Sequence, residues 1–513
     1  MKNLKYILFT GIASLFLTSC GNDFLDVTPQ GQLTADQYFS EEERIDDGVS
    51  QIYSCLNWRF FRLGNMYFST HEMGAGDLVA GASADLRAFE DFSYMANNWF
   101  LELYWGRWYQ YLNDCNVVID LAKDKTSDIA IKATAQARFF RAYHYFDMIQ
   151  VFGEVPLRDH VPGLDEIDIP KSSEEEIYTL IISDLEYAIA NLPTHSQWGE
   201  ANNGRICKET AEGWLSIVYL FRQDYANALK YAENVINSGT FSLYSNYRDL
   251  FAPWNNYSTE NMMPGHYSYQ NIAGRVRNPY AEYQGLPTEE GYGSYLVLPS
   301  PEMVKAYEDG DLRKTASIFT KGDQIEGLAE AGKTITWLSD YEAKGLIYGN
   351  RKVLWDYDKN GWNYPGWPNG DFFSQELNLP FLRYAEILLI AAEASNEQGN
   401  TAKAQELLEQ IRFRARGNKT FEETGKLPKI TTTDKTELRH AIWNERRIEF
   451  AFEGRRWFDL IRYEKVEAGY MTNFIRNILG RGNFDYNKHT KFPVPQINID
   501  SSDGILVQND YWK

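Results

Sequence analysis

The sequence predicts an all-α fold, a tetratricopeptide-like scaffold of helical hairpins that carries long, irregular, aromatic-rich loops. Apolar residues recur at spacings of three and four over most of the chain, which is the period of a helix with one buried face. Pairs of such segments are joined by short polar turns and form units of roughly 34 residues. Three other stretches lack this period and are rich in aromatic residues, with Gly and Pro scattered through the later two. These observations together favour stacked helix pairs decorated by loops.

The N-terminus is typical of an export signal. Lys2 and Lys5 precede an apolar stretch, residues 7–17, that is too short to span a bilayer. The stretch ends in Leu17-Thr18-Ser19-Cys20, which has the small residues and the cysteine of a lipobox. We expect residues 1–19 to be a lipoprotein signal peptide and Cys20 to receive the lipid. An ordinary secretory signal with an accidental cysteine is the alternative.

Residues 172–192 predict a helix whose two ends are both marked. Ser173 and Glu176 have the spacing of a capping box, and Pro193 stops the helix. Two later stretches each predict an antiparallel helix pair. The first turns at Gln223-Asp224, and the second, residues 385–414, turns at Gly399-Asn400. Small alanines at the crossings allow the paired helices to approach closely.

Three segments break the helical pattern: residues 57–110, 240–300 and 334–375. Long irregular stretches in a compact protein are usually functional or disordered, and the high aromatic content argues against disorder. Within the first segment Trp105 has helical spacing to Tyr109, so we expect it in the core. We expect His144 to be a core residue as well.

Residues 444–462 concentrate four acids and five arginines in one amphipathic run. Arg446 and Glu449 are three apart, and Arg455 and Asp459 are four apart, so each pair can meet on a helix face. Large apolar residues between them predict partial burial, and buried charges must be paired. We favour an ion network that locks the C-terminal helices to the scaffold over a catalytic carboxylate pair.

Four stretches resemble the SusD/RagB family of outer-membrane nutrient-binding lipoproteins. They are the charged run 444–462, the helix 383–399, the segment 137–146 with Phe152-Gly153-Glu154-Val155-Pro156-Leu157, and Pro493-Val494-Pro495-Gln496 with Gln508-Asn509. The resemblance implies one SusD-like domain over residues 20–513 with about four stacked helix pairs. Its helical N-terminal part would span about 20–240, and its loop-rich, helical C-terminal part about 241–513.

The resemblance also implies a glycan-binding site in the loops. Indole and phenol rings offer flat apolar faces with a polar edge, on which sugar rings stack. By position in the family, Asp77, Arg87 and Trp99 are candidate ligand contacts. Trp254, Tyr283 and Tyr292 are similar candidates from the middle segment.

Other site chemistries find little support in the sequence. Asp356-x-Asp358-x-Asn360-Gly361 imitates the start of a calcium loop, but Trp367 stands where the position-12 carboxylate belongs, so a solvated turn is favoured. No HExxH, G-x-S-x-G or P-loop motif occurs, so we expect no metal, no cofactor and no catalysis. Cys55, Cys115 and Cys207 permit at most one disulfide and are expected to be buried thiols.

Charge narrows the range of partners. Without Lys2 and Lys5 the chain has 49 basic and 71 acidic residues, a formal charge of −22 that repels nucleic acid and anionic lipid. We therefore predict an outward-facing lipoprotein of the outer membrane that captures an oligosaccharide or polysaccharide. The resemblance implies delivery to a SusC-like TonB-dependent transporter. A peptide or glycopeptide importer and an α-helical glycoside hydrolase with two carboxylates are the alternatives.

Overall fold

The computed structural model describes residues 44–58, 67–163, 166, 168–265, 283–289, 294–323, 336–354 and 377–513. The signal segment, Cys20, Tyr292 and the calcium-like motif 356–361 lie outside these residues. Among the described residues helices dominate, and the strands form three short antiparallel pairs. None of the helices described is long and apolar enough to cross a bilayer.

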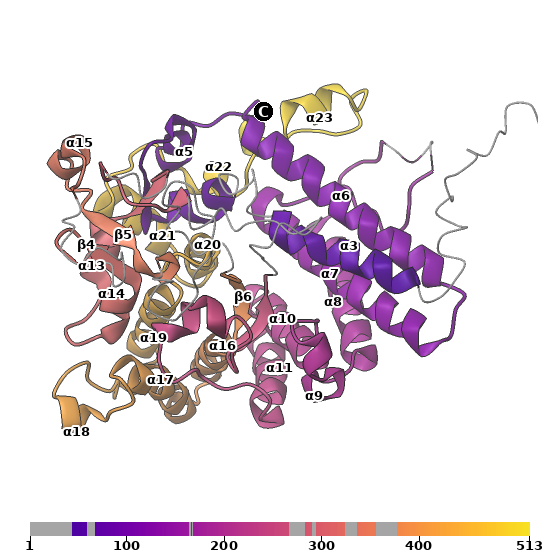
Figure 1. The fold of residues 1–513 in the computed structure, drawn as a ribbon. Coiled ribbons are helices and arrows are strands. Elements are labelled where there is room, and N and C mark those ends of the chain that lie inside the picture. Colours follow the sequence, from indigo (N-terminus) through magenta and orange to yellow (C-terminus); the bar gives the residue numbers. More distant parts are fainter. Residues whose placement is uncertain are drawn as a thin grey trace, which may run out of the picture.

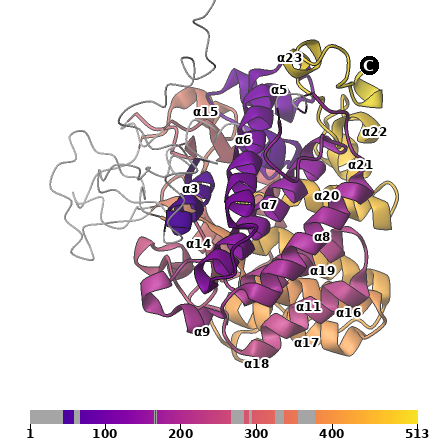
Figure 2. The same cartoon turned by 90° about the vertical axis from the view of Figure 1, so that its right-hand side faces the viewer.

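Nine helices pack in succession, each on the next, to form the scaffold (Figure 1). They are α3 (Ile45–Trp58), α6 (Trp99–Ala122), α7 (Asp128–Phe152), α8 (Glu174–Asn191), α10 (Lys208–Phe221), α11 (Tyr225–Ser238), α16 (Tyr384–Glu397), α17 (Thr401–Ala415) and α19 (Lys435–Glu449). The contact between α11 and α16 joins segments far apart in sequence. Figure 2, turned by 90°, shows the same helices as one layered stack. The predicted all-α scaffold is confirmed.

The capping and turn signals in the sequence produce the expected local structures. Ser173 and Glu176 make the predicted capping box at the start of α8. The turn before α11 has Gln223 at φ 60°, and the side chain of Asp224 caps the helix by accepting the N–H of Asn227. Gly399, at φ 85°, and the capping residue Asn400 make the corresponding turn before α17.

Short strand pairs and shorter helices complete the described part of the fold. Strand β1 (Leu78–Ala80) pairs with β3 (Val297–Pro299), β2 (Asn261–Pro264) with β6 (Pro380–Arg383), and β4 (Ile318–Thr320) with β5 (Tyr348–Asn350). The shorter helices are α5 (Ala84–Glu90), α9 (His195–Trp198), α13 (Pro301–Ala306), α14 (Leu312–Ser317), α15 (Ser339–Ala343), α18 (Phe421–Thr424), α20 (Arg456–Val466), α21 (Tyr470–Asn473), α22 (Tyr486–His489) and α23 (Gln496–Asp500).

The structure corrects two boundaries that the sequence suggested. The first irregular segment ends at Asn98, whose side chain caps α6 by accepting the N–H of Phe100, so residues 99–110 are helical. The charged run 444–462 is not continuous, because α19 ends at Glu449 and α20 begins at Arg456. In the turn between them Gly454 has φ 73°, and a Cβ there would lie 1.6 Å from the Tyr67 hydroxyl. Close packing against Tyr67 therefore requires glycine.

The core contains the residues that the sequence placed in it. Trp105 and His144 are buried, and one large cluster of apolar side chains runs through the helices and the strand pairs. Cys55, Cys115 and Cys207 are buried free thiols, as expected.

Candidate ligand-binding surface

Arg87 and Tyr295 are brought together by the β1–β3 pair and α5. Ser83 caps α5 by accepting the N–H of Leu86, and Arg87 lies exposed one turn further along. The Arg87 Nη2 donates to the carbonyl oxygens of Ala80 and Gly81, both at 3.3 Å. The following N–H groups, of Gly81 and Ala82, donate to the carbonyls of Leu296 and Tyr295 at 2.8 and 3.1 Å.

Tyr295 meets Tyr341 of α15 edge to face, with ring centroids 5.3 Å apart and planes at 80°. The Nζ of Lys344 lies 5.6 Å from the Tyr341 centroid. Desolvation and the neighbouring Tyr295 raise the pKa of Tyr341, and the Arg87 charge opposes the shift. The backbone carbonyl of Tyr283 accepts the N–H of Leu296 at 2.8 Å, and the Tyr283 side chain packs, partly buried, against the hydrophobic core.

Trp99 contacts α5, the short helix to which Arg87 belongs. Its side chain is 46% exposed, and its indole N–H donates to Asp85 Oδ2 at 3.4 Å. Asp85 lies in the first turn of α5, two residues before Arg87. We call Arg87, Trp99, Tyr295 and Tyr341 the aromatic surface. It combines flat apolar rings with a guanidinium and a carboxylate nearby, a set of groups suited to a hydroxyl-rich ring.

The other predicted contacts lie elsewhere. Asp77 is 1% exposed, and its Oδ1 accepts both Nε and Nη2 of Arg447 at 2.9 and 2.6 Å, so it is a buried ion-pair partner beneath β1. Trp254 is 37% exposed. Its segment is hydrogen-bonded to a different part of the chain, because the N–H of Asn378 donates to Asn256 Oδ1 at 2.8 Å. Tyr292 falls outside the described residues.

Sequence reasoning missed two members of the aromatic surface. Tyr295 is one of many aromatic residues in the segment 240–300. Its backbone φ of 35° distinguishes it from the others, and this angle cannot be read from the sequence. Tyr341 belongs to a one-turn helix with no capping signal in its side chains. The pairing of Tyr295 with Tyr341 depends on contacts between segments far apart in the sequence, so no local pattern marks it.

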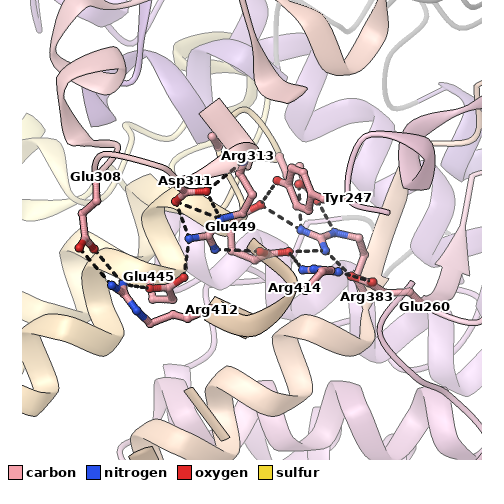
Figure 3. Close-up of polar contacts among 12 residues, drawn as sticks. Tyr247, Glu260, Glu308, Asp311, Arg313, Arg383, Arg412, Arg414, Glu445 and Glu449 are labelled. Carbon is pink, nitrogen blue, oxygen red and sulfur yellow. Dashed lines mark hydrogen bonds and ion pairs between the residues drawn. The ribbon is translucent and has the colours of Figure 1, made fainter. Parts of the chain in front are cut away.

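The charged residues of α19 form a buried network with segments from the whole C-terminal half (Figure 3). Glu449 is fully buried, and its carboxylate accepts from Arg383 at 2.9 Å, Arg414 at 2.5 Å and Arg313 at 3.1 Å. Glu260 bridges Arg383 and Arg414, each at 2.6 Å. The network continues through the ion pairs Arg313–Asp311, Arg313–Glu445, Glu445–Arg412, Arg412–Glu308, Arg383–Glu453 and Glu453–Lys352.

The predicted local pairs within the charged run are wrong. Arg446 pairs with Asp459 and Glu386, not with Glu449, and Arg455 pairs with Glu386, not with Asp459. Each side chain instead forms ion pairs between different elements. We expected this of the charged run as a whole, because such pairs lock the C-terminal helices to the scaffold. Burial opposes ionisation of Glu449, but the three arginines outweigh it and hold the pKa of the carboxyl well below its usual range. A carboxylate held this way is a poor general acid.

Known proteins match almost the whole chain. A family model described as the SusD family matches residues 225–512, and one described as starch-binding, associating with the outer membrane, matches residues 23–220. The chain is 27% identical to SusD-like protein P2 of Formosa agariphila over 96% of this chain and 97% of that protein.

Solved structures share the fold. A SusD homologue from Bacteroides thetaiotaomicron has a TM-score of 0.76 at 22% identity, covering 92% of this chain and 98% of its own. A laminarin-binding SusD-like protein has a TM-score of 0.71 at 23% identity, covering 91% and 99%. The likeness extends over the scaffold and the loop-bearing side together.

Proposed function

This chain belongs to the SusD family, and from that premise we propose that it is a cell-surface lipoprotein that binds a glycan and passes it uncleaved to a SusC-like TonB-dependent transporter. A relative with this fold is named for binding laminarin, and one matching family model is named for binding starch. Both names denote neutral glucose polymers, which suit a strongly acidic chain better than anionic polysaccharides do.

The aromatic surface is the observation that carries this proposal. Trp99 is exposed over nearly half of its area, and Tyr341 lies between a second tyrosine and a lysine. Sugar rings stack on such faces, while Arg87 and Asp85 offer a donor and an acceptor for hydroxyls. Of the candidates from sequence, Arg87 and Trp99 belong to this surface, and Tyr283, which is hydrogen-bonded through its backbone to Leu296, is proposed as a further contact. Trp254 and Tyr292 are proposed as further contacts of a long ligand.

The binding role is tested with the soluble form, residues 21–513, titrated calorimetrically with malto-oligosaccharides and laminari-oligosaccharides. We expect micromolar to millimolar affinity, and we expect Trp99→Ala and Tyr341→Ala each to weaken binding by about 1–3 kcal/mol if the ring is a central anchor. Tyr511→Ala is the matched control, because Tyr511 is 61% exposed and is no part of the aromatic surface.

Three results would contradict the proposal. Full-strength binding by both variants would remove the aromatic surface from the site. Shortening of the oligosaccharide during incubation, measured by chromatography of the recovered glycan, would support the glycoside hydrolase alternative. Binding of peptides in place of glycans would support the peptide-import alternative.

A further inference from the structure

A pocket of about 360 Å³ lies on a different part of the molecule from the aromatic surface. Its walls come from the middle of α6, the segment that follows α7, and α23 with the residues after it. Figure 1 shows α23 beside the N-terminal end of α6, and the two helices are in contact. This volume lies at the small end of the roughly 300–1,000 Å³ of small-molecule sites, which suits one or two rings.

Hydrogen bonds hold two walls of the pocket in place. Trp105 and Tyr109, four apart on α6, both line it, and their ring centroids are 5.3 Å apart. The Tyr109 hydroxyl donates to the carbonyl of Pro156 at 2.8 Å. Asn116 Nδ2 donates to the carbonyls of Arg158 and His160 at 3.1 and 3.0 Å. The segment after α7 is therefore fixed against α6, and the pocket between them is preformed.

The third wall contains an acceptor with an unmet hydrogen bond. Asn498 of α23 lines the pocket, and its Oδ1 is buried with no hydrogen-bond partner in the described part of the chain. Leaving a buried acceptor unpaired is unfavourable, and a turn of the Asn498 amide toward the pocket would let a ligand hydroxyl bond to it. Arg158 and Asp168 also line the pocket, and their opposite charges balance. The pocket thus offers aromatic walls, donors and acceptors without net charge.

We propose that this pocket is a second glycan subsite that holds one sugar unit of a neutral oligosaccharide, an inference that rests on the proposed glycan-binding function. Trp99, Leu103 and Gly106 follow one another at helical spacings of four and three along α6, and Gly106 lines the pocket. Trp99 and Leu103 are exposed, and the distance along the axis from Trp99 to Gly106 is about 10 Å. A chain stacked on Trp99 can follow this face into the pocket.

Gly106 provides a sharp test. A Cβ built at Gly106 meets nothing within 4 Å, so a larger side chain has room to enter the pocket without a backbone clash. Gly106→Phe should fill the pocket, while Gly106→Ala should leave it open, and both replace a glycine inside a helix with a better helix former. Thermal unfolding of both variants checks that the fold is retained. Asn498→Leu removes the unpaired acceptor as an independent second variant.

The measurement is hydrogen exchange of the soluble form with maltoheptaose, laminariheptaose or alanyl-alanine. In the wild type one of the two glycans should protect residues 105–116 and 496–506 together with residues 83–90. Gly106→Phe should lose the protection at 105–116 and 496–506 and bind about tenfold more weakly or worse, while keeping protection at 83–90. Gly106→Ala should match the wild type, and Asn498→Leu should behave as Gly106→Phe does.

The outcomes separate the two proposals. Protection at 83–90 without protection at 105–116 and 496–506, or pocket protection unchanged in Gly106→Phe, would overturn the subsite and leave the proposed function intact. Pocket protection by alanyl-alanine and by neither glycan would overturn the sugar assignment. Failure of both glycans to bind the wild type anywhere would overturn the subsite and count against the proposed function itself.

Discussion

The environment of the Glu72 side chain makes ionisation of its carboxyl group unfavourable. It ends a π-helical turn, Phe68–Glu72, is 1% exposed, and accepts the backbone N–H of Gly454. Burial, helped by the neighbouring Asp77 and Glu453, raises its pKa to about 8 against the lowering effects of that hydrogen bond and of Lys352. Glu72 is therefore protonated in the folded protein at neutral pH.

Replacing Glu72 with Gln should stabilise the protein at high pH. The pKa of about 8 in the folded protein exceeds the ordinary value of 4.5 for a glutamate, so the stability that protonated Glu72 allows is fully present below pH 4.5 and is lost as the pH rises through 8. Glu72→Gln should match the wild type near pH 4.5 and be more stable by up to about 3 kcal/mol at pH 7. Denaturant unfolding at both pH values measures this, with the exposed Glu102→Gln as control. A pH-independent difference would mean that Glu72 is ionised in the fold.

At the scale of single helices and turns, the sequence predicts the features that depend only on neighbouring residues. The capping box at Ser173 and the turn at Gly399-Asn400 depend on residues within four positions of one another, and both are present. The partners of Glu449 were not predictable in this way. A pair within one helix contributes only about 0.2–0.5 kcal/mol, so three arginines from other segments outcompete the nearby Arg446 once the carboxylate is buried.

The same limit explains the candidate site. Arg87 and Trp99 could be selected by position in a family pattern, and the β1–β3 pair then brings Arg87 close to Tyr295. Asp77 could not be distinguished from them, because its burial depends on Arg447, a residue far along the chain. Tyr341 carried no signal, because its role depends on where α15 packs.

Glu449 should be far more important for stability than an exposed acid on a helix. Glu449→Gln leaves three buried arginines short of a charge, so we expect a loss of about 3–5 kcal/mol in the free energy of unfolding at pH 7. Asp128→Asn, which removes the exposed pair with Lys132 at 2.5 Å, should cost under about 1 kcal/mol. The lowered pKa of Glu449 means that its stabilisation is present above pH 4.5 and is lost as the pH falls. Equal losses in the two variants at pH 7 would show that the network contributes no more than a surface pair.

At the scale of the whole molecule, attachment and partner follow from the proposed function. Cys20→Ala should move the protein from the membrane fraction to the soluble fraction without changing its melting temperature, because the lipid on Cys20 is the proposed anchor. Fractionation followed by a carbonate wash measures this, with Cys55→Ser as the control thiol substitution. Retention of Cys20→Ala in the washed membranes would contradict the anchoring proposal.

A binder tethered at a membrane needs a channel to deliver its ligand. We predict that the full-length chain co-purifies from native membranes, in mild detergent, with a large TonB-dependent barrel. The contact should bury more than the roughly 1,600 Å² of a standard interface, and the tether keeps the local concentration of ligand at the barrel high. The helical scaffold should supply this contact. Repeated recovery of the chain alone would leave only a surface trap for glycans.

Because Glu449 lies late in the chain, it is synthesised after the cationic residues of its network. Arg313, Arg383, Arg412, Arg414 and Lys352 all precede it, and before Glu445 they have only Glu260, Glu308 and Asp311 as acids in the network. A nascent chain that has not reached α19 holds more cations than it can bury in pairs, so those segments stay hydrated. Folding of the C-terminal half is therefore completed only after Glu445, Glu449 and Glu453 have been synthesised. A product truncated before them stays open there and is distinguishable, by proteases and chaperones, from a finished molecule.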